Sequence, residues 1–387
     1  MAVCIFDPAS KVLGLKELLF FGGWVLFIFY IIVNGRTVYM PMRMIIYLLL
    51  FIFVIPLISI NYYFLINGDI INYDGYSYFK PYLFLTIVLI LSSTKIDLIK
   101  PTIIMISLLS ILTIIIFIII IFNESFVQFL YLAIIDRFGI LDIGERTYGG
   151  FVFSEIHFHA SPLIIFPIGY FSLAVLDSRG LKRILFGLFL VINMFGMFLG
   201  GTRNNVLAST ITPILIAFWY SKRKIITSLI LIAVLLISIG TYQGIIKDMF
   251  DTEESSNSTR LSFQEDYFNL FADSKVLFFG QGLGSSFNTT VRGYVSLTEL
   301  TYYEFIRRFG LILSSACFLL LLYPLGKLRL KQYRNEHYIF ICYALYLMGC
   351  FFQPLLMSST GMLLMSLILY KTFTPPLDSH RHVLTLD

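Results

Sequence analysis

The feature that most constrains this chain is a series of apolar runs about as long as the hydrocarbon core of a membrane is thick. The run Thr102–Phe122 is the most uniform of them, and it carries no charged residue. A span of about 20 apolar residues is what a transmembrane helix needs. Only 13% of the 387 residues are charged and 58% are hydrophobic, whereas soluble domains are about a quarter charged. We therefore predict an all-α polytopic membrane protein.

The runs predict about eleven transmembrane helices in a single membrane domain, residues 1–387. The expected spans are 15–33, 44–66, 81–94, 102–122, 158–176, 184–200, 206–220, 225–245, 305–325, 337–356 and 358–372. Between the fourth and fifth spans, apolar residues recur at helical spacing through Phe126–Ile140. This pattern is typical of an amphipathic helix that lies among the lipid headgroups.

The cysteines and the N-terminal run exclude several other classes. The four cysteines, Cys4, Cys317, Cys342 and Cys350, show neither CxxC nor metal-ligand spacing. We expect no disulfide and no zinc site from them. The first apolar run ends at Asn34-Gly35-Arg36 without a small-residue cleavage site, so we expect it to remain as an anchor.

Basic residues predict the orientation in the membrane. Lys and Arg concentrate in the segments 36–43, 95–100, 179–183, 222–224 and 327–334. These are alternate loops when eleven spans are drawn, and short basic loops face the cytoplasm. The net charge of +5 is therefore explained by topology rather than by nucleic-acid binding. The N-terminus, with Lys11 and Lys16, then lies outside, against the rule.

The polar loops on the opposite side hold the residues that could carry chemistry. They are 67–80, 123–157, 200–205 and the long loop 247–304. Arg203 follows Gly200-Gly201-Thr202 between two apolar runs. It either reaches to the headgroups as an interfacial arginine or binds an anion, for which neighbouring backbone donors and a planar guanidinium are well suited.

Arg260 and the glycine turn belong to the long loop. Arg260 follows the acidic run 251–254, so it either pairs with that run or forms a second phosphate clamp. Gly280-Gln281-Gly282-Leu283-Gly284 lacks both a following Lys-Ser/Thr and a βαβ pattern. We interpret the segment around Gly282 as a tight turn against the floor of a site rather than as a nucleotide loop.

Two glutamates flank Leu300-Thr301-Tyr302-Tyr303. Glu304 and Arg308 are four residues apart and can pair on one helix face. Glu299 has no charged partner at helical spacing, so it is either a solvated loop residue or a free carboxylate able to accept a proton. Glu155, His157 and His159 form another polar group. Their spacing favours interfacial hydrogen bonding over a metal site, with a role in holding a diphosphate or sugar as the alternative.

The order of these motifs resembles the O-antigen polymerase and ligase superfamily of bacterial envelopes. The matching pieces are Gly201–Leu207 with its arginine, then Arg260, then Gly280–Gly284, then Glu299–Leu311, which has the form E-x-x-Y-x-E-x-x-x-R-F-G-L. The resemblance covers roughly 184–325 and the overall hydropathy plan. Each motif is short, so their order and placement carry the comparison.

The resemblance implies a membrane glycosyltransferase of GT-C-like architecture. Such an enzyme would use undecaprenyl-diphosphate-linked oligosaccharides, without a nucleotide sugar, metal or other cofactor, at the periplasmic face of the bacterial inner membrane. It would transfer the growing glycan onto a new lipid-linked repeat unit, with a chain-length regulator protein as an expected partner. Ligases of the superfamily carry histidine where Glu299 stands, which favours a polymerase.

The implied roles follow the matched positions. Arg203 and Arg260 would stabilise charge on the leaving diphosphate, and Glu299 would activate the acceptor hydroxyl. Arg307 and Arg308 would hold a second diphosphate, unless one pairs with Glu304. The remaining substrate-contacting candidates are Tyr302, Tyr303, Glu304, His157, His159 and Gly282. The alternatives are an O-antigen ligase, a lipid-linked oligosaccharide flippase and a non-catalytic scaffold. A flippase is disfavoured because it needs ionisable residues within its spans.

Overall fold

The computed structural model describes residues 2–6, 14–35, 37–67, 75–123, 125–130, 135, 140–148, 151–222, 224 and 255–374. The chain divides into two compact units, each built from three separate segments. Unit 1 comprises Met1–Lys16, Ile99–Asn257 and Glu336–Gly349, and unit 2 comprises Glu17–Leu98, Ser258–Asn335 and Cys350–Asp387. The predicted eighth span, 225–245, and the acidic run 251–254 lie outside the described residues.

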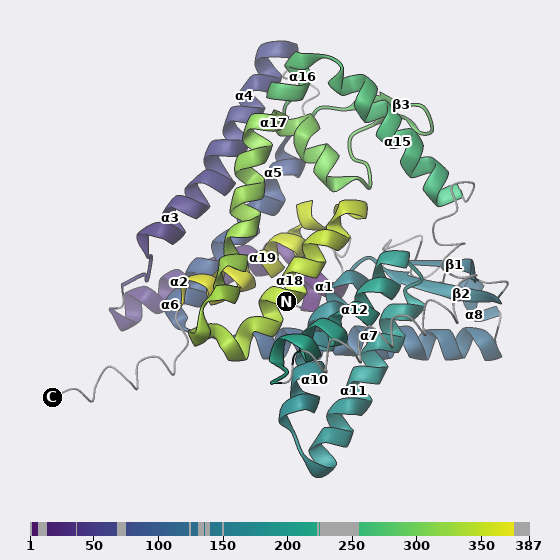
Figure 1. Ribbon diagram of the computed structural model, residues 1–387. Coiled ribbons are helices and arrows are strands. Elements are labelled where there is room, and N and C mark those ends of the chain that lie inside the picture. Colours follow the sequence, from purple (N-terminus) through teal and green to yellow (C-terminus); the bar gives the residue numbers. More distant parts are fainter. Residues whose placement is uncertain are drawn as a thin grey trace. The chain divides into compact units, whose positions relative to one another are not determined.

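Unit 1 is a helical bundle centred on α10. Its helices are α1 (Ala2–Phe6), α7 (Ile99–Phe122), α8 (Ser125–Leu130), α10 (Ile165–Asp177), α11 (Gly180–Leu199), α12 (Arg203–Tyr220) and α18 (His337–Gly349). Helix α10 packs against α7, α11, α12 and α18 (Figure 1). Small residues permit the closest approach between α7 and α11, because a Cβ added to Gly196 would lie 2.8 Å from the Cα of Ser110.

A β-hairpin in unit 1 lies almost entirely within the interval 123–157, which was expected to be a polar loop. Strands β1 (Leu141–Tyr148) and β2 (Phe151–Phe158) pair antiparallel, with Leu141 opposite Phe158. The predicted interfacial helix is seen as α8, Ser125–Leu130; most of 131–139 lies outside the described residues. The sequence analysis did not predict the hairpin, so the fold is predominantly helical rather than purely so.

Unit 2 joins membrane helices to a polar segment. Its helices are α2 (Leu15–Asn34), α3 (Met42–Leu48), which continues through a π-helical turn into α4 (Ile55–Asn67), α5 (Gly75–Leu83), α6 (Ile87–Thr94), α15 (Ser255–Phe271), α16 (Ser274–Phe279), α17 (Thr301–Leu322) and α19 (Ser359–Phe373). Helix α17 contacts α4 and α16, and α19 contacts α5 and α6 (Figure 1).

The interval expected as a long loop, 247–304, is largely ordered structure from Ser255 onward. It contains α15, α16 and a short hairpin of β3 (Phe287–Thr289) and β4 (Gly293–Val295). Phe263, Tyr267 and Phe271 recur every four residues on α15. The first two are fully buried in a cluster with Phe287 and Leu300. This apolar stripe explains why the segment folds despite its polar composition.

Five helices in the described part of the chain are long and apolar enough to cross a membrane. They are Leu15–Asn34, Met42–Ile66, Ile99–Phe122, Gly180–Leu199 and Thr301–Arg329. Two shorter apolar helices, Tyr78–Thr94 and Ser161–Asp177, coincide with the third and fifth predicted spans. The tenth predicted span, 337–356, is interrupted because α18 ends at Gly349. The chain is therefore a helical membrane protein, and the number of eleven spans stays a prediction.

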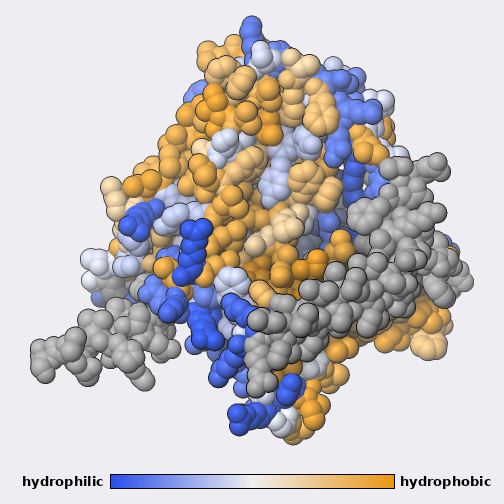
Figure 2. All heavy atoms as spheres, viewed as in Figure 1, coloured by the Kyte–Doolittle hydropathy of each residue, from blue (hydrophilic) through white to orange (hydrophobic). Residues whose placement is uncertain are grey.

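Polar and basic side chains occupy distinct parts of unit 2. Hydrophilic side chains gather over α15, whereas apolar side chains cover the outer face of α4 (Figure 2); Leu57, Ile58 and Leu65 of α4 are exposed. At the other end of the unit, Tyr39 bonds to Ser93 through its backbone N–H, and Lys371 pairs with Asp97. Lys327 lies within electrostatic reach of Arg43. The predicted segments 36–43 and 327–334, and residues 95–98 of the segment 95–100, thus lie at the end of unit 2 away from α15 and α16 (Figure 1).

Candidate functional site

A buried carboxylate network lies where α15 meets the start of α17 in unit 2. Glu304 is fully buried. Its Oε1 accepts hydrogen bonds from the Tyr267 hydroxyl (2.6 Å) and the Thr298 backbone N–H (3.0 Å). Its Oε2 accepts from Arg307 Nη2 (2.8 Å) and Arg308 Nε (3.0 Å). Glu304 is therefore saturated with donors, and the predicted pairing with Arg308 is confirmed.

The two arginines of this network hold the surrounding loops together. Arg307 also donates to the backbone oxygen of Ser285 (2.9 Å), and Arg307 and Arg308 both donate to the backbone oxygen of Ser296 (2.8 and 2.6 Å). Both guanidinium groups are buried. Their bonds to protein oxygens assign them a structural role, which argues against the direct contact with a second diphosphate that the resemblance implied.

Tyr267 completes the network from α15. Its hydroxyl also lies 2.8 Å from the Thr298 hydroxyl. Burial, reinforced by the neighbouring Glu304 carboxylate, raises the pKa of Tyr267 well above its ordinary value. The hydroxyl therefore stays protonated and remains a donor to Glu304.

The glycine turn 280–284 packs against the point where α17 is kinked. Gly310 has φ +68° and ψ 168°, a conformation that interrupts α17. A Cβ at Gly310 would overlap the backbone of Phe278 and Phe279. Gly282, with φ +89°, lies against the backbone of Tyr63 in α4. The interpretation of this segment as a close-packed turn is supported by these contacts, and Gly282 has a packing role.

A second, more accessible charge cluster surrounds Glu299. Arg292 Nη2 lies 3.3 Å from Glu299 Oε1, and Arg260 Nε lies 3.5 Å from Oε2. The side chains of Arg260, Glu299 and Arg292 are 24%, 36% and 50% exposed. Among the described residues, the Nε atom of Arg260 has no hydrogen-bond partner, so its contact with Glu299 is an ion pair only. The expectation of a free Glu299 carboxylate is wrong, because two cations bracket it.

Packing and hairpin geometry place the two arginines on either side of Glu299. The guanidinium of Arg260 lies 5.5 Å from the centre of the Phe352 ring, and that of Arg292 lies 5.3 Å from the centre of the Phe263 ring. Asp266 of α15 accepts hydrogen bonds from the backbone N–H and hydroxyl of Thr290 (2.9 and 2.6 Å). This fixes the β3–β4 tip, and with it Arg292, beside the helix that carries Arg260.

Tyr302 and Tyr303 belong to the aromatic packing beneath this cluster. Tyr303 packs on Tyr267, with ring centres 5.3 Å apart. Tyr302 contacts Phe318 and Phe351 at 5.4 and 5.7 Å. Both tyrosines thus have aromatic protein neighbours where the resemblance suggested sugars.

Unit 1 holds a separate polar group around the Gly200-Gly201 break. Thr202 caps α12 by accepting a hydrogen bond from the Asn205 backbone N–H (3.3 Å), which makes Arg203 the first residue of the helix. Gly201 has φ +65°, and a Cβ there would overlap the side chain of Glu155. His157 Nδ1 lies 3.1 Å from the backbone oxygen of Gly200. The structure therefore joins the β2 residues to the Arg203 segment.

The two histidines of β2 differ in their surroundings. Burial lowers the pKa of His157, opposed in part by the negative charge of Glu155. A neutral His157 can donate its Nδ1 hydrogen to Gly200. His159 is half-exposed and lies 3.7 Å from Asp142. In the part of the chain that the structure describes, no group of three or more His, Cys, Asp or Glu residues is placed to hold a metal ion.

The candidate residues thus fall into three sets. Arg203, His157 and His159 belong to unit 1, and the Glu299 cluster and the Glu304 network belong to unit 2. Sequence reasoning missed Arg292 and Asp266. The only local signal for Arg292 was the turn residue Gly293 beside it, which marks a hairpin tip but not an ion pair with a residue seven positions away.

Comparisons with protein-family models, with characterised proteins and with solved structures find no match to this chain.

Proposed function

We propose that this membrane protein is a glycosyltransferase of the O-antigen polymerase kind, with the Glu299 cluster in its active site. The observation that carries the proposal is that two partly exposed guanidinium groups bracket one carboxylate, 3.3 and 3.5 Å away. They stand on the polar segment of a chain that has five helices in its described part long and apolar enough to cross a membrane. Both substrates of such an enzyme are lipid-linked and require a site that is accessible from the membrane.

The cluster supplies the charges that the reaction needs. A diphosphate arriving at the site would compete with Glu299 for Arg260 and Arg292, because guanidinium forks match phosphate oxygens in pairs. Ion pairs that are partly exposed contribute only about 0–1 kcal/mol, so a multiply charged ligand can displace the carboxylate. Binding of the donor would thereby release Glu299 at the moment when a proton acceptor is needed.

The proposed step is a displacement at the anomeric carbon of the donor glycan. The bond from that carbon to the phosphate oxygen breaks, and undecaprenyl diphosphate leaves with the electron pair, stabilised by Arg260 and Arg292. The acceptor hydroxyl forms the new glycosidic bond, and its proton passes to Glu299. Arg203 is proposed as a further diphosphate contact, on the sequence resemblance alone.

Purified protein in proteoliposomes, supplied with lipid-linked repeat units, tests this function. We expect Arg260→Ala and Arg292→Ala each to shorten the product ladder and reduce turnover about 100-fold, the size of a lost charge-stabilising donor. Glu299→Gln should reduce turnover while donor binding persists. The matched control is Arg329→Ala, which removes an exposed arginine of the basic segment and should leave the ladder unchanged.

The outcomes distinguish the alternatives. Long chains made by all three site variants would contradict the proposed site. Transfer only to lipid A core would identify a ligase, and movement of substrate across the vesicle membrane without bond formation would identify a flippase. Activity that is lost in EDTA would contradict the expected metal-free reaction.

A further inference from the structure

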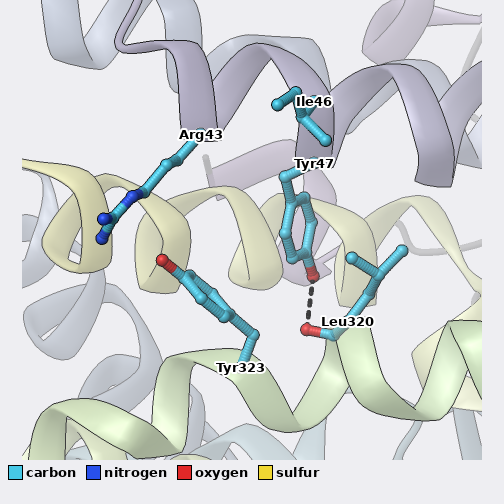
Figure 3. A pocket seen from close by; sticks show the side chains of 5 residues that line it. All are labelled: Arg43, Ile46, Tyr47, Leu320 and Tyr323. Atoms are coloured by element: carbon cyan, nitrogen blue, oxygen red, sulfur yellow. Dashed lines mark hydrogen bonds between the residues drawn. The ribbon is translucent and has the colours of Figure 1, made fainter.

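A mostly apolar pocket with one cationic side chain, Arg43, lies at the end of unit 2 opposite the Glu299 cluster. It has a volume of about 270 Å³ and is lined by Arg43, Ile46, Tyr47, Leu320 and Tyr323 (Figure 3). Arg43, Ile46 and Tyr47 come from α3, whereas Leu320 lies at the end of α17 and Tyr323 follows it directly. None of these residues belongs to the sites described above.

Two of the lining residues, Tyr47 and Tyr323, are held in place by their neighbours. The Tyr47 hydroxyl donates to the backbone oxygen of Leu320 (2.9 Å), as the dashed line in Figure 3 marks. Tyr323 stacks on Phe373 with ring centres 5.8 Å apart, and Tyr47 lies 6.0 Å from the same ring. The pocket is therefore a built feature of three helices rather than a gap between loose side chains.

Its charge is positive and uncompensated. Among the described residues, Arg43 forms no ion pair and the Tyr323 hydroxyl has no hydrogen-bond partner. In Figure 3 the guanidinium of Arg43 and the hydroxyl of Tyr323 lie on the same side of the pocket. Lys327 is close enough to feel the charge of Arg43, and its ammonium group contacts Tyr333 (3.3 Å) rather than a carboxylate.

The pocket lies at the ends of two helices that are long and apolar enough to cross a membrane. Arg43 is the second residue of the apolar helix Met42–Ile66, and Lys327 is near the end of Thr301–Arg329. At these two helix ends, the hydrocarbon of a bilayer is expected to give way to headgroups. Ile46 and Leu320 supply an apolar wall on which an acyl chain can lie, while the cations face the polar end.

We propose that this pocket binds the phosphate headgroup of an anionic membrane phospholipid, with Arg43 and Tyr323 donating to the phosphate and Ile46 and Leu320 contacting the acyl chain. An anionic lipid can contact both the cationic side chain and the apolar wall of the pocket, whereas free phosphate can contact only the cationic side chain. Basic residues next to membrane spans attract anionic headgroups in general; the pocket adds a fixed geometry to that attraction.

Native mass spectrometry of delipidated, detergent-purified protein tests the site. The probes are dioleoyl-phosphatidylglycerol, dioleoyl-phosphatidylcholine and inorganic phosphate. We expect the wild type to bind phosphatidylglycerol more tightly than phosphatidylcholine, and Arg43→Gln to weaken the first interaction about tenfold, as loss of a charge-assisted hydrogen bond implies. Lys331→Gln removes an equal charge from an exposed residue of the basic segment 327–334 and should change the affinity less than about twofold.

Three results would overturn the proposal. They are equal losses in Arg43→Gln and Lys331→Gln, equal affinity for the two lipids, and displacement of phosphatidylglycerol by inorganic phosphate at similar concentration. Tyr323→Phe removes only an exposed hydroxyl and should also weaken phosphatidylglycerol binding. It therefore tests the same site if Arg43→Gln does not fold. Because the readout is lipid binding, its result is independent of any glycosyl transfer.

Discussion

Charge balance at single residues distinguishes the two clusters of unit 2. Glu304 faces two buried arginines, so the network carries one more positive than negative charge. Removing one partner from a buried ion pair leaves a charge without compensation. Around Glu299 the same two-to-one ratio occurs at the surface, where water screens each charge. The first cluster therefore serves folding, and the second is free to exchange partners.

Glu304→Gln is the substitution expected to damage folding most directly. It leaves Arg307 and Arg308 buried side by side without an anion, which should lower stability by about 3–5 kcal/mol. The apparent melting temperature of the detergent-purified protein measures the loss. Glu299→Gln is the control, with an expected change below about 1 kcal/mol. Equal melting temperatures for the two variants would contradict the structural role of Glu304.

His157 should make stability depend on pH. Its pKa is lowered in the folded protein, so below the ordinary value of about 6.5 the unfolded chain binds the proton more readily. The contribution of the neutral ring is thus fully present above pH 6.5 and is lost as pH falls through the folded pKa. We expect the melting temperature to drop between about pH 7 and pH 5, and His157→Gln to reduce that slope.

The matched variant for this measurement is His159→Gln, because the His159 ring is 39% exposed. This variant should leave the pH dependence of the melting temperature near that of the wild type. A slope that changes equally in the two variants would remove His157 as the cause.

At the scale of elements, the kink in α17 depends on a residue without a side chain. Three glycines separate the contributions of conformation and space. Gly310 has positive φ and no room for a Cβ, Gly293 has positive φ and open space, and Gly326 has open space without positive φ.

The loss of stability in the corresponding alanine variants should decrease in that order, from Gly310→Ala to Gly326→Ala. Gly310→Ala should lower the melting temperature most, since it adds an overlap with the Phe278 and Phe279 backbone to a strain of about 1–3 kcal/mol. Gly293→Ala should lower the free energy of unfolding by about 1–2 kcal/mol. Gly326→Ala should change it by no more than about 0.5 kcal/mol. A Gly310→Ala protein as stable as the wild type would show that α17 tolerates a straight path.

The elements also show how far sequence reasoning extends. Long apolar helices such as Ile99–Phe122 were predictable because hydropathy alone decides them. The β1–β2 hairpin was missed although Gly149-Gly150 separates two eight-residue runs, a turn signal for hairpins. The interval 123–157 was treated as a polar loop instead, with a helix expected only over Phe126–Ile140. Likewise, α15 was taken as loop because its stripe of Phe263, Tyr267 and Phe271 is narrow.

Within the site, the ion pair between residues close in the sequence was predicted, and the ion pair between distant residues was not. Glu304 and Arg308 are one helical turn apart, and their pair was predicted from that spacing alone. Arg260 and Glu299 are 39 positions apart in the sequence, and only the folding of α15 against the β3–β4 hairpin brings them together. No rule of spacing contains that information.

At the scale of the whole molecule, the arrangement of unit 2 predicts a labelling pattern. Tyr294 of the β3–β4 hairpin and Lys331 of the basic segment are both exposed and belong to opposite ends of the unit. In a Cys4→Ser background, a membrane-impermeant maleimide should label Tyr294→Cys from the outer side of the membrane and Lys331→Cys only after permeabilisation, following the positive-inside rule.

The background for this experiment is favourable. Cys317, Cys342 and Cys350 are buried and should remain unlabelled in the folded protein. Labelling of both introduced cysteines from the same side would contradict the proposed orientation of the unit.

The kink at Gly310 has a consequence for where α17 meets the membrane. Beyond it, α17 runs from Leu311 to Leu322 and continues as a 3-10 helix to Arg329. At a rise of about 1.5 Å per residue in an α-helix and about 2.0 Å in a 3-10 helix, this part alone is about 32 Å long. The hydrocarbon core is about 30 Å thick. The segment before the kink is therefore not needed to cross the bilayer, so the buried charges of the Glu304 network need not enter hydrocarbon.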